Sequence, residues 1–124
     1  MKEAIATNNA PAAIGPYSQA IKTTGLIYCS GQLPIDPATG KMPEDIKAQT
    51  RQSLANVKAI LAEEGLNLNA VVKTTVLLAD MSLFGAMNEV YSEEFAQPFP
   101  ARSAFAVKAL PMGALVEIEV IAAR

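Results

Sequence analysis

The sequence contains no histidine and no tryptophan, and Cys29 is its single cysteine. The lack of histidine removes the commonest general acid and base near neutral pH, and it excludes Ser-His and Cys-His nucleophilic dyads. Zinc sites draw mainly on cysteine and histidine, so one cysteine without histidine argues against a zinc ion. A single cysteine also excludes an intrachain disulfide. Any chemistry therefore falls to other polar side chains or to backbone groups.

Long apolar runs and runs of basic residues are also missing. No stretch approaches the roughly 20 apolar residues of a membrane-spanning helix, and residues 1–9 lack the apolar segment of a signal peptide. We therefore expect a cytoplasmic protein with no membrane partner. The formal net charge is −2, which argues against nucleic acid as a partner.

The sequence is rich in apolar residues, which allow one hydrophobic core. Its 124 residues are 51% hydrophobic and contain no repeat or linker, so we expect a single domain over 1–124. Apolar residues recur at helical spacing over 44–64, and Ser82 is the expected N-cap of a second helix. Strand patterns cover 4–7, 18–23, 26–33, 71–79, 101–107 and 115–122.

The order β-β-β-α-β-α-β-β predicts an α+β fold with one mixed sheet and two helices on one face. Alternation in the last strand directs Val116, Ile118 and Val120 toward the helices and Glu117 to the opposite face. We expect Arg102 on that opposite face as well. Because this face mixes charged with small and apolar residues, we interpret it as an oligomer interface that contains ligand pockets.

Arg102 and Glu117 are the first candidates for a functional site. Each lies in an otherwise small or apolar strand, and such charges are costly to bury unless they are paired or bind a ligand. We expect the two strands to be adjacent, joined by a Pro/Gly turn. From the residues alone two interpretations stay open: a ligand site, or a structural ion pair of Arg102 with Glu117 or Glu119.

Several motifs, taken in order and spacing, give the whole chain a resemblance to a known family. They are Gly15-Pro16-Tyr17-Ser18-Gln19-Ala20, Ser30-Gly31-Gln32 with Pro34, Gln49 with Asn56-Val57, Asn88-Glu89-Val90-Tyr91, Pro100-Ala101-Arg102-Ser103, Leu110-Pro111 and Val116-Glu117-Ile118-Glu119. They resemble the RidA (YjgF/YER/UK) family of reactive-intermediate deaminases. The resemblance implies a chorismate-mutase-like fold that assembles as a homotrimeric barrel with active sites between subunits.

The resemblance further implies a reaction and a set of site residues. The reaction is hydrolysis of 2-imino acids such as 2-iminobutanoate and 2-iminopropanoate, or their enamines, to 2-keto acids and ammonia, without cofactor or metal. Arg102 would clamp the substrate carboxylate through two parallel hydrogen bonds, and Glu117 would orient or deprotonate the attacking water. The other positions implied to bind substrate or water are Tyr17, Ser30, Gly31, Asn88, Tyr91 and Ala104. Many family members have cysteine where Ala104 stands, so a thiol-dependent role is not expected there.

Two other functions stay open at this point. One is a regulatory module that binds small carboxylates or metabolites without turnover. The other is a ribonuclease or translation inhibitor, an activity reported for some members of the family. Glu117 favours the enzyme over the binding module, because an acid near a bound carboxylate opposes binding but helps to activate water. The lack of histidine and the negative charge argue against the ribonuclease.

Overall fold

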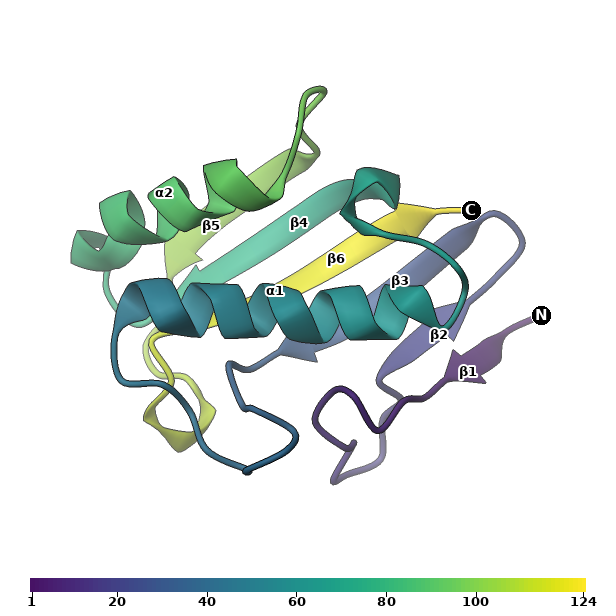
Figure 1. Ribbon diagram of the computed structural model, residues 1–124, viewed down its shortest axis with the longest axis horizontal. Coiled ribbons are helices and arrows are strands. Elements are labelled where there is room, and N and C mark those ends of the chain that lie inside the picture. Colours follow the sequence, from purple (N-terminus) through teal and green to yellow (C-terminus); the bar gives the residue numbers. More distant parts are fainter.

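The computed structural model describes residues 1–124 and shows a six-stranded sheet with both helices on one face (Figure 1). The strands are β1 (Glu3–Ile5), β2 (Ala20–Lys22), β3 (Leu26–Gln32), β4 (Val71–Leu78), β5 (Ala101–Ala106) and β6 (Val116–Ala123). The helices are α1 (Ile46–Ala62) and α2 (Phe84–Glu94), with short 3-10 turns η1 (Leu68–Ala70), η2 (Met81–Leu83) and η3 (Pro111–Gly113). The expected α+β class and element order are confirmed.

The sheet has the strand order β1-β2-β3-β6-β4-β5. Only β4 and β5 are parallel, and the other neighbours pair antiparallel. The expectation that β5 and β6 are adjacent is therefore wrong, because β4 lies between them. The physical reason is the α2 crossover, which returns the chain to the same end of the sheet and places β5 parallel to β4. The other edge of β4 is then available to β6.

The core lies between the sheet and the helices. One cluster of 20 buried residues joins the two layers, and it includes Leu54 and Ile60 of α1. Val116, Ile118 and Val120 are buried in it, as the alternation of β6 predicts. Neither helix covers the opposite sheet face (Figure 1), and apolar side chains such as Tyr28, Val72 and Phe105 are exposed on the strands.

The two helices begin differently, and the prediction that Ser82 caps the second one is wrong. Asp45 is the N-cap of α1, and its Oδ1 accepts a hydrogen bond from the Ala48 amide at 2.8 Å. Ser82 is not the N-cap of α2. Instead the Asp80 carboxylate accepts from the Ser82 amide and starts η2, after which α2 begins without a side-chain cap. A carboxylate placed two residues earlier thus starts the turn.

Two buried amides of α1 hold the loops at one end of the sheet. Asn56 donates to the carbonyl oxygens of Leu33 and Ile35, each at 3.0 Å. Gln49 accepts from the Leu115 amide at 2.8 Å. These bonds satisfy backbone groups in segments that have no strand partner. They also position the segment after β3 and the start of β6.

Candidate active site

Arg102 lies on the helix-covered face of the sheet. Its neighbour across the β4–β5 pair is Thr74, which is completely buried. The guanidinium carbon lies 4.6 Å from the centroid of the Tyr91 ring and 5.4 Å from that of Phe84, both on α2. The expectation that Arg102 shares a face with Glu117 is therefore wrong. The aromatic faces of α2 provide a favourable contact for a cation at the border of the core.

The guanidinium is held by an amide and by no acid. Its Nη1 donates to Asn88 Oδ1 at 2.6 Å, and Arg102 takes part in none of the salt bridges of the structure. Within one chain, this excludes the ion pair with Glu117 or Glu119. The guanidinium has further N–H donors in a planar fork, which matches the two oxygens of a carboxylate. Arg102 is thus oriented and remains available to an anionic ligand.

Tyr91 contributes a ring face to this arrangement, while its hydroxyl points into the core. The hydroxyl lies 2.7 Å from Thr74 Oγ1, and the Phe95 ring packs at a centroid distance of 4.5 Å. Burial raises the pKa of Tyr91, against the opposing effects of the Thr74 hydrogen bond and the Arg102 charge. Ala104 follows Arg102 on the same face and packs against the core.

Glu117 lies on the opposite face, against the backbone of β3. A Cβ atom built on Gly31 would lie 2.0 Å from Glu117 Oε2, so the carboxylate occupies the space that any side chain at position 31 would need. The register between β3 and β6 shifts between Cys29 and Gln32, as in a β-bulge. The bulge and the missing side chain together bring Gly31 and Glu117 into contact.

The environment of Glu117 shifts the titration of its carboxyl group to higher pH. Partial burial raises the pKa of this carboxyl group, and the negative charge of Glu119 raises it further. A carboxylate with a raised pKa is a stronger base once it is ionised. Glu117 therefore has the property required of a group that accepts a proton from water.

Ser30 and Tyr17 lie beside Gly31. The Ser30 hydroxyl donates to the Ser18 carbonyl at 2.6 Å, which ties β3 to the segment that carries Tyr17. The Tyr17 side chain is 52% exposed. A groove of about 260 Å³ is lined by Tyr17 and Gly31 and by apolar side chains that include Met112. This groove is roomy enough for a small organic side chain.

The structure thus sorts the predicted residues into two clusters. The arginine cluster consists of Arg102, Asn88, Tyr91 and Ala104, together with Phe84, which the sequence did not predict as a site residue. The glutamate cluster consists of Glu117, Gly31, Ser30 and Tyr17. Because Arg102 and Glu117 lie on opposite faces of the sheet, one chain does not bring the two clusters onto one small molecule.

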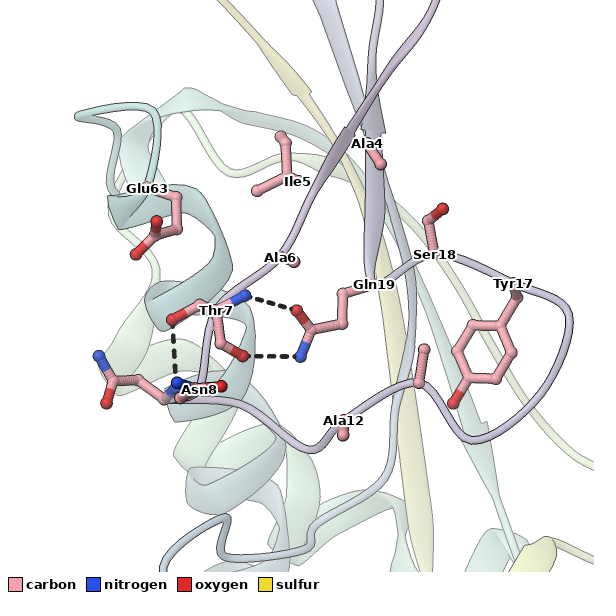
Figure 2. Close-up of a pocket in the computed structure, with 12 residues that line it drawn as sticks. Ala4, Ile5, Ala6, Thr7, Asn8, Ala12, Tyr17, Ser18, Gln19 and Glu63 are labelled. Atoms are coloured by element: carbon pink, nitrogen blue, oxygen red, sulfur yellow. Dashed lines mark hydrogen bonds between the residues drawn. The ribbon is translucent and has the colours of Figure 1, made fainter.

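The largest hollow lies elsewhere, between the N-terminal segment and α1 (Figure 2). It has a volume of about 810 Å³, and its only charged lining residue is Glu63. The Gln19 amide at its wall is bonded to both backbone groups of Thr7, as the dashed lines show. Without a lysine or arginine, this hollow does not suit an anionic substrate.

Three further observations bear on the chemistry of the chain. No group of three or more His, Cys, Asp or Glu side chains is placed to hold a metal ion. Cys29 is buried, and burial raises the pKa of its thiol to about 12, so it carries no nucleophilic thiolate. No helix has both the length and the apolar composition needed to cross a bilayer.

The comparison with protein families places the chain in one of them. The family model described as Endoribonuclease L-PSP matches residues 7–124. A RutC family protein of Pyrococcus horikoshii is 56% identical over 98% of both chains. A 2-iminobutanoate/2-iminopropanoate deaminase of Mus musculus is 50% identical over 98% of this chain and 91% of its own. The chain belongs to the RidA (YjgF) family, which confirms the resemblance.

Solved structures agree with this assignment. RidA from the Antarctic bacterium Psychrobacter sp. is 48% identical and superposes with a TM-score of 0.95 over 98% of this chain and 99% of its own. Escherichia coli TdcF, solved with bound serine, is 42% identical and has a TM-score of 0.93 over 98% of both chains. The fold of the chain is that of the RidA proteins.

Proposed function

We propose that this chain hydrolyses 2-imino acids, and their enamine tautomers, to 2-keto acids and ammonia without a cofactor. The observation that carries the proposal is Arg102, which is oriented by Asn88 and Tyr91 and has no acidic partner. Such a guanidinium is suited to the carboxylate that every 2-imino acid carries. Identity near 50% over the full length to named 2-iminobutanoate/2-iminopropanoate deaminases supports the same reaction.

The reaction asks little of the protein beyond positioning and proton transfer. A 2-imino acid held at its carboxylate by Arg102 has its imine carbon fixed in space. Protonation of the imine nitrogen makes that carbon electrophilic. Glu117 accepts a proton from water as the oxygen adds to the carbon, and the proton then passes to the nitrogen. The C–N bond then breaks to release ammonia while Glu117 takes the proton of the new hydroxyl, which gives the 2-keto acid and consumes one water for each imine.

The division into two clusters leads us to place the active site between subunits. Arg102 of one copy and Glu117 of another would then face the same substrate. The uncovered sheet face beside Glu117 exposes apolar residues such as Tyr28 and Phe105, each 47% exposed, and is suited to contact with further copies. A homotrimer, as the resemblance implies, joins the clusters through such contacts.

The first test compares wild type with Arg102→Ala and Arg102→Lys. An amino-acid oxidase generates the imine, and semicarbazide trapping reports how fast it disappears. We expect Arg102→Ala to fold and assemble but to lose about 100-fold or more in kcat/KM, because two charge-assisted hydrogen bonds are lost. Arg102→Lys lacks the fork and should recover little.

Arg51→Ala is the matched control, because Arg51 is an exposed arginine of α1. Its kcat/KM should equal that of wild type. Full activity in either Arg102 variant would contradict the role of the guanidinium. Failure of the wild type to accelerate the loss of several different imines would contradict the function itself.

The second candidate is a carboxylate-binding module without turnover. It is favoured by the structure of TdcF, a relative solved with bound serine, which is a small carboxylate. Thermal stabilisation of the wild type by small carboxylates, without any effect on imines, would favour this module. Ribonuclease activity would be supported only by RNA cleavage that co-purifies with the protein and survives Arg102→Ala.

A further inference from the structure

Thr74 is a polar residue in the middle of an apolar layer. It lies on β4, is completely buried, and shares its face with Val76 and Leu78. Its one side-chain hydrogen bond joins it to the Tyr91 hydroxyl at 2.7 Å. A buried hydroxyl pair of this kind can be replaced by apolar groups of the same shape with little change in stability. Stability alone therefore does not account for the pair.

Both members of the pair are neighbours of Arg102. Thr74 is the neighbour of Arg102 across the parallel β4–β5 pair. The Tyr91 ring, whose hydroxyl bonds to Thr74, presents its face to the guanidinium at 4.6 Å. The ring is thus fixed at its hydroxyl end by Thr74, while Phe95 packs against it at 4.5 Å. The Tyr91 hydroxyl makes no other hydrogen bond.

The Thr74–Tyr91 hydrogen bond also joins α2 to β4 close to the Arg102 guanidinium. Asn88 precedes Tyr91 by three residues, so both lie on the same side of α2. Asn88 holds the edge of the guanidinium at 2.6 Å, while Tyr91 supports its face. A small shift of α2 relative to β5 would therefore displace both contacts at once.

We propose that Thr74 is a positioning residue that orients Arg102 through the ring of Tyr91. This inference rests on the proposed function, in which Arg102 binds the substrate carboxylate. Thr74 itself touches no substrate. Its contribution should appear in the affinity for the carboxylate more than in the chemical step, because Glu117 and the attacking water lie outside this contact chain.

The experiment uses Thr74→Val, Tyr91→Phe, the double variant and Thr74→Ser. Each single apolar variant leaves one buried hydroxyl without a partner, so both should melt at lower temperature than wild type. The double variant removes both hydroxyls and should recover most of that loss. If the pair had only a structural role, the double variant would also regain the wild-type KM and kcat.

We expect the double variant to keep a KM for the imine about five- to tenfold above wild type, with kcat within about twofold. The dissociation constant of 2-oxobutanoate, measured by calorimetry, should rise by a similar factor. Thr74→Ser keeps the hydroxyl and should restore both values. Thr50→Val is the matched control, because Thr50 is a buried threonine of α1 bonded to the Ile46 carbonyl.

A stable double variant with wild-type KM and wild-type affinity for 2-oxobutanoate would overturn the positioning role. Equal losses in the Thr50→Val control would also overturn it, since the effect would then be a general one of the core. If wild type binds 2-oxobutanoate without hydrolysing imines, the proposed function fails, and the dissociation constants of the same variants still decide the role of Thr74. If wild type does neither, both proposals are overturned.

Discussion

Glu117 illustrates a conflict between stability and activity within one side chain. Burial and Glu119 raise its pKa, so the folded chain binds this proton more tightly than the unfolded chain does. The free energy of unfolding therefore falls as the pH rises from the unfolded value through the raised folded value. Activity that depends on ionised Glu117 rises over the same interval. The two pH dependences have opposite signs.

We predict that kcat/KM falls as the pH is lowered, with an apparent pKa above the ordinary value of a glutamate. Glu117→Gln should lower kcat by about 100-fold or more and remove the associated slope of stability against pH. Glu119→Gln should move the acid limb partway to lower pH, because burial still raises the pKa of Glu117 but the added effect of the Glu119 charge is gone. Activity profiles and melting temperatures across the same pH range measure these effects. An unmoved acid limb in Glu119→Gln would contradict the assignment to Glu117.

Gly31 provides a second residue-scale prediction. A Cβ at this position would lie 2.0 Å from Glu117 Oε2, and Gly31 has no positive φ that would strain an alanine. We expect Gly31→Ala to fold and to displace the carboxylate, with a loss of about 100-fold in kcat. Gly85→Ala is the control, because its added methyl group meets nothing within 4 Å. Wild-type kcat in Gly31→Ala would show that this carboxylate position does not matter.

At the scale of elements, buried side-chain amides form hydrogen bonds with backbone groups that are not paired in a helix or a sheet. Gln19 precedes β2 and binds the N-terminal segment that carries Tyr17 (Figure 2). Its Oε1 accepts from the Thr7 amide at 2.7 Å, and its Nε2 donates to the Thr7 and Pro11 carbonyls at 3.0 and 2.8 Å. Residues 6–18 pair with no strand, so Gln19 supplies several of the hydrogen bonds that hold their backbone.

We predict that Gln19→Leu lowers the free energy of unfolding by about 2 kcal/mol, because several buried backbone groups lose their partner. Hydrogen exchange should become faster in residues 6–18, and protease cleavage should appear there first. Asn8→Ala is the control, since Asn8 lies exposed in the same segment. Unchanged exchange in residues 6–18 would show that Gln19 does not hold the segment.

At the scale of the whole molecule, the opposite placement of Arg102 and Glu117 leads to a test of assembly. Neither Arg102→Ala nor Glu117→Gln is expected to be active alone. When the two variants are co-expressed, a site that takes Arg102 from one subunit and Glu117 from the other can be intact. Every mixed cyclic trimer then has one intact site of three, so purified mixed trimers should show about a third of the wild-type activity. A site within one subunit would give no restoration.

The measurement is the imine-loss assay on mixed oligomers isolated through two different affinity tags. Size-exclusion chromatography with light scattering gives the mass of the same sample. Mixed oligomers without activity, beside an active wild type, would contradict the site between subunits. Mixing after assembly serves as the control, because pre-formed homo-oligomers should remain inactive.

Much of the element pattern follows from local sequence alone. The apolar spacing of 44–64 predicts α1, and the alternation of Val116, Ile118 and Val120 identifies the buried face of β6, as the structure confirms. These features are local, because helix and strand periods act within one segment. The motifs also indicate the family, which the comparisons confirm, and the isolated charges make Arg102 and Glu117 candidate site residues.

The face of Arg102 and the neighbour of β6 depend on contacts between distant segments. β5 (Ala101–Ala106) contains mostly small or apolar side chains, so its sequence does not show which of them face the helices. Its orientation was set by the α2 crossover, and the cation was accommodated by the aromatic rings of α2. Likewise, the Thr74–Tyr91 bond joins residues 17 positions apart across two layers. The face of Arg102 and the neighbour of β6 are decided only when the elements pack, because each element alone is compatible with either arrangement.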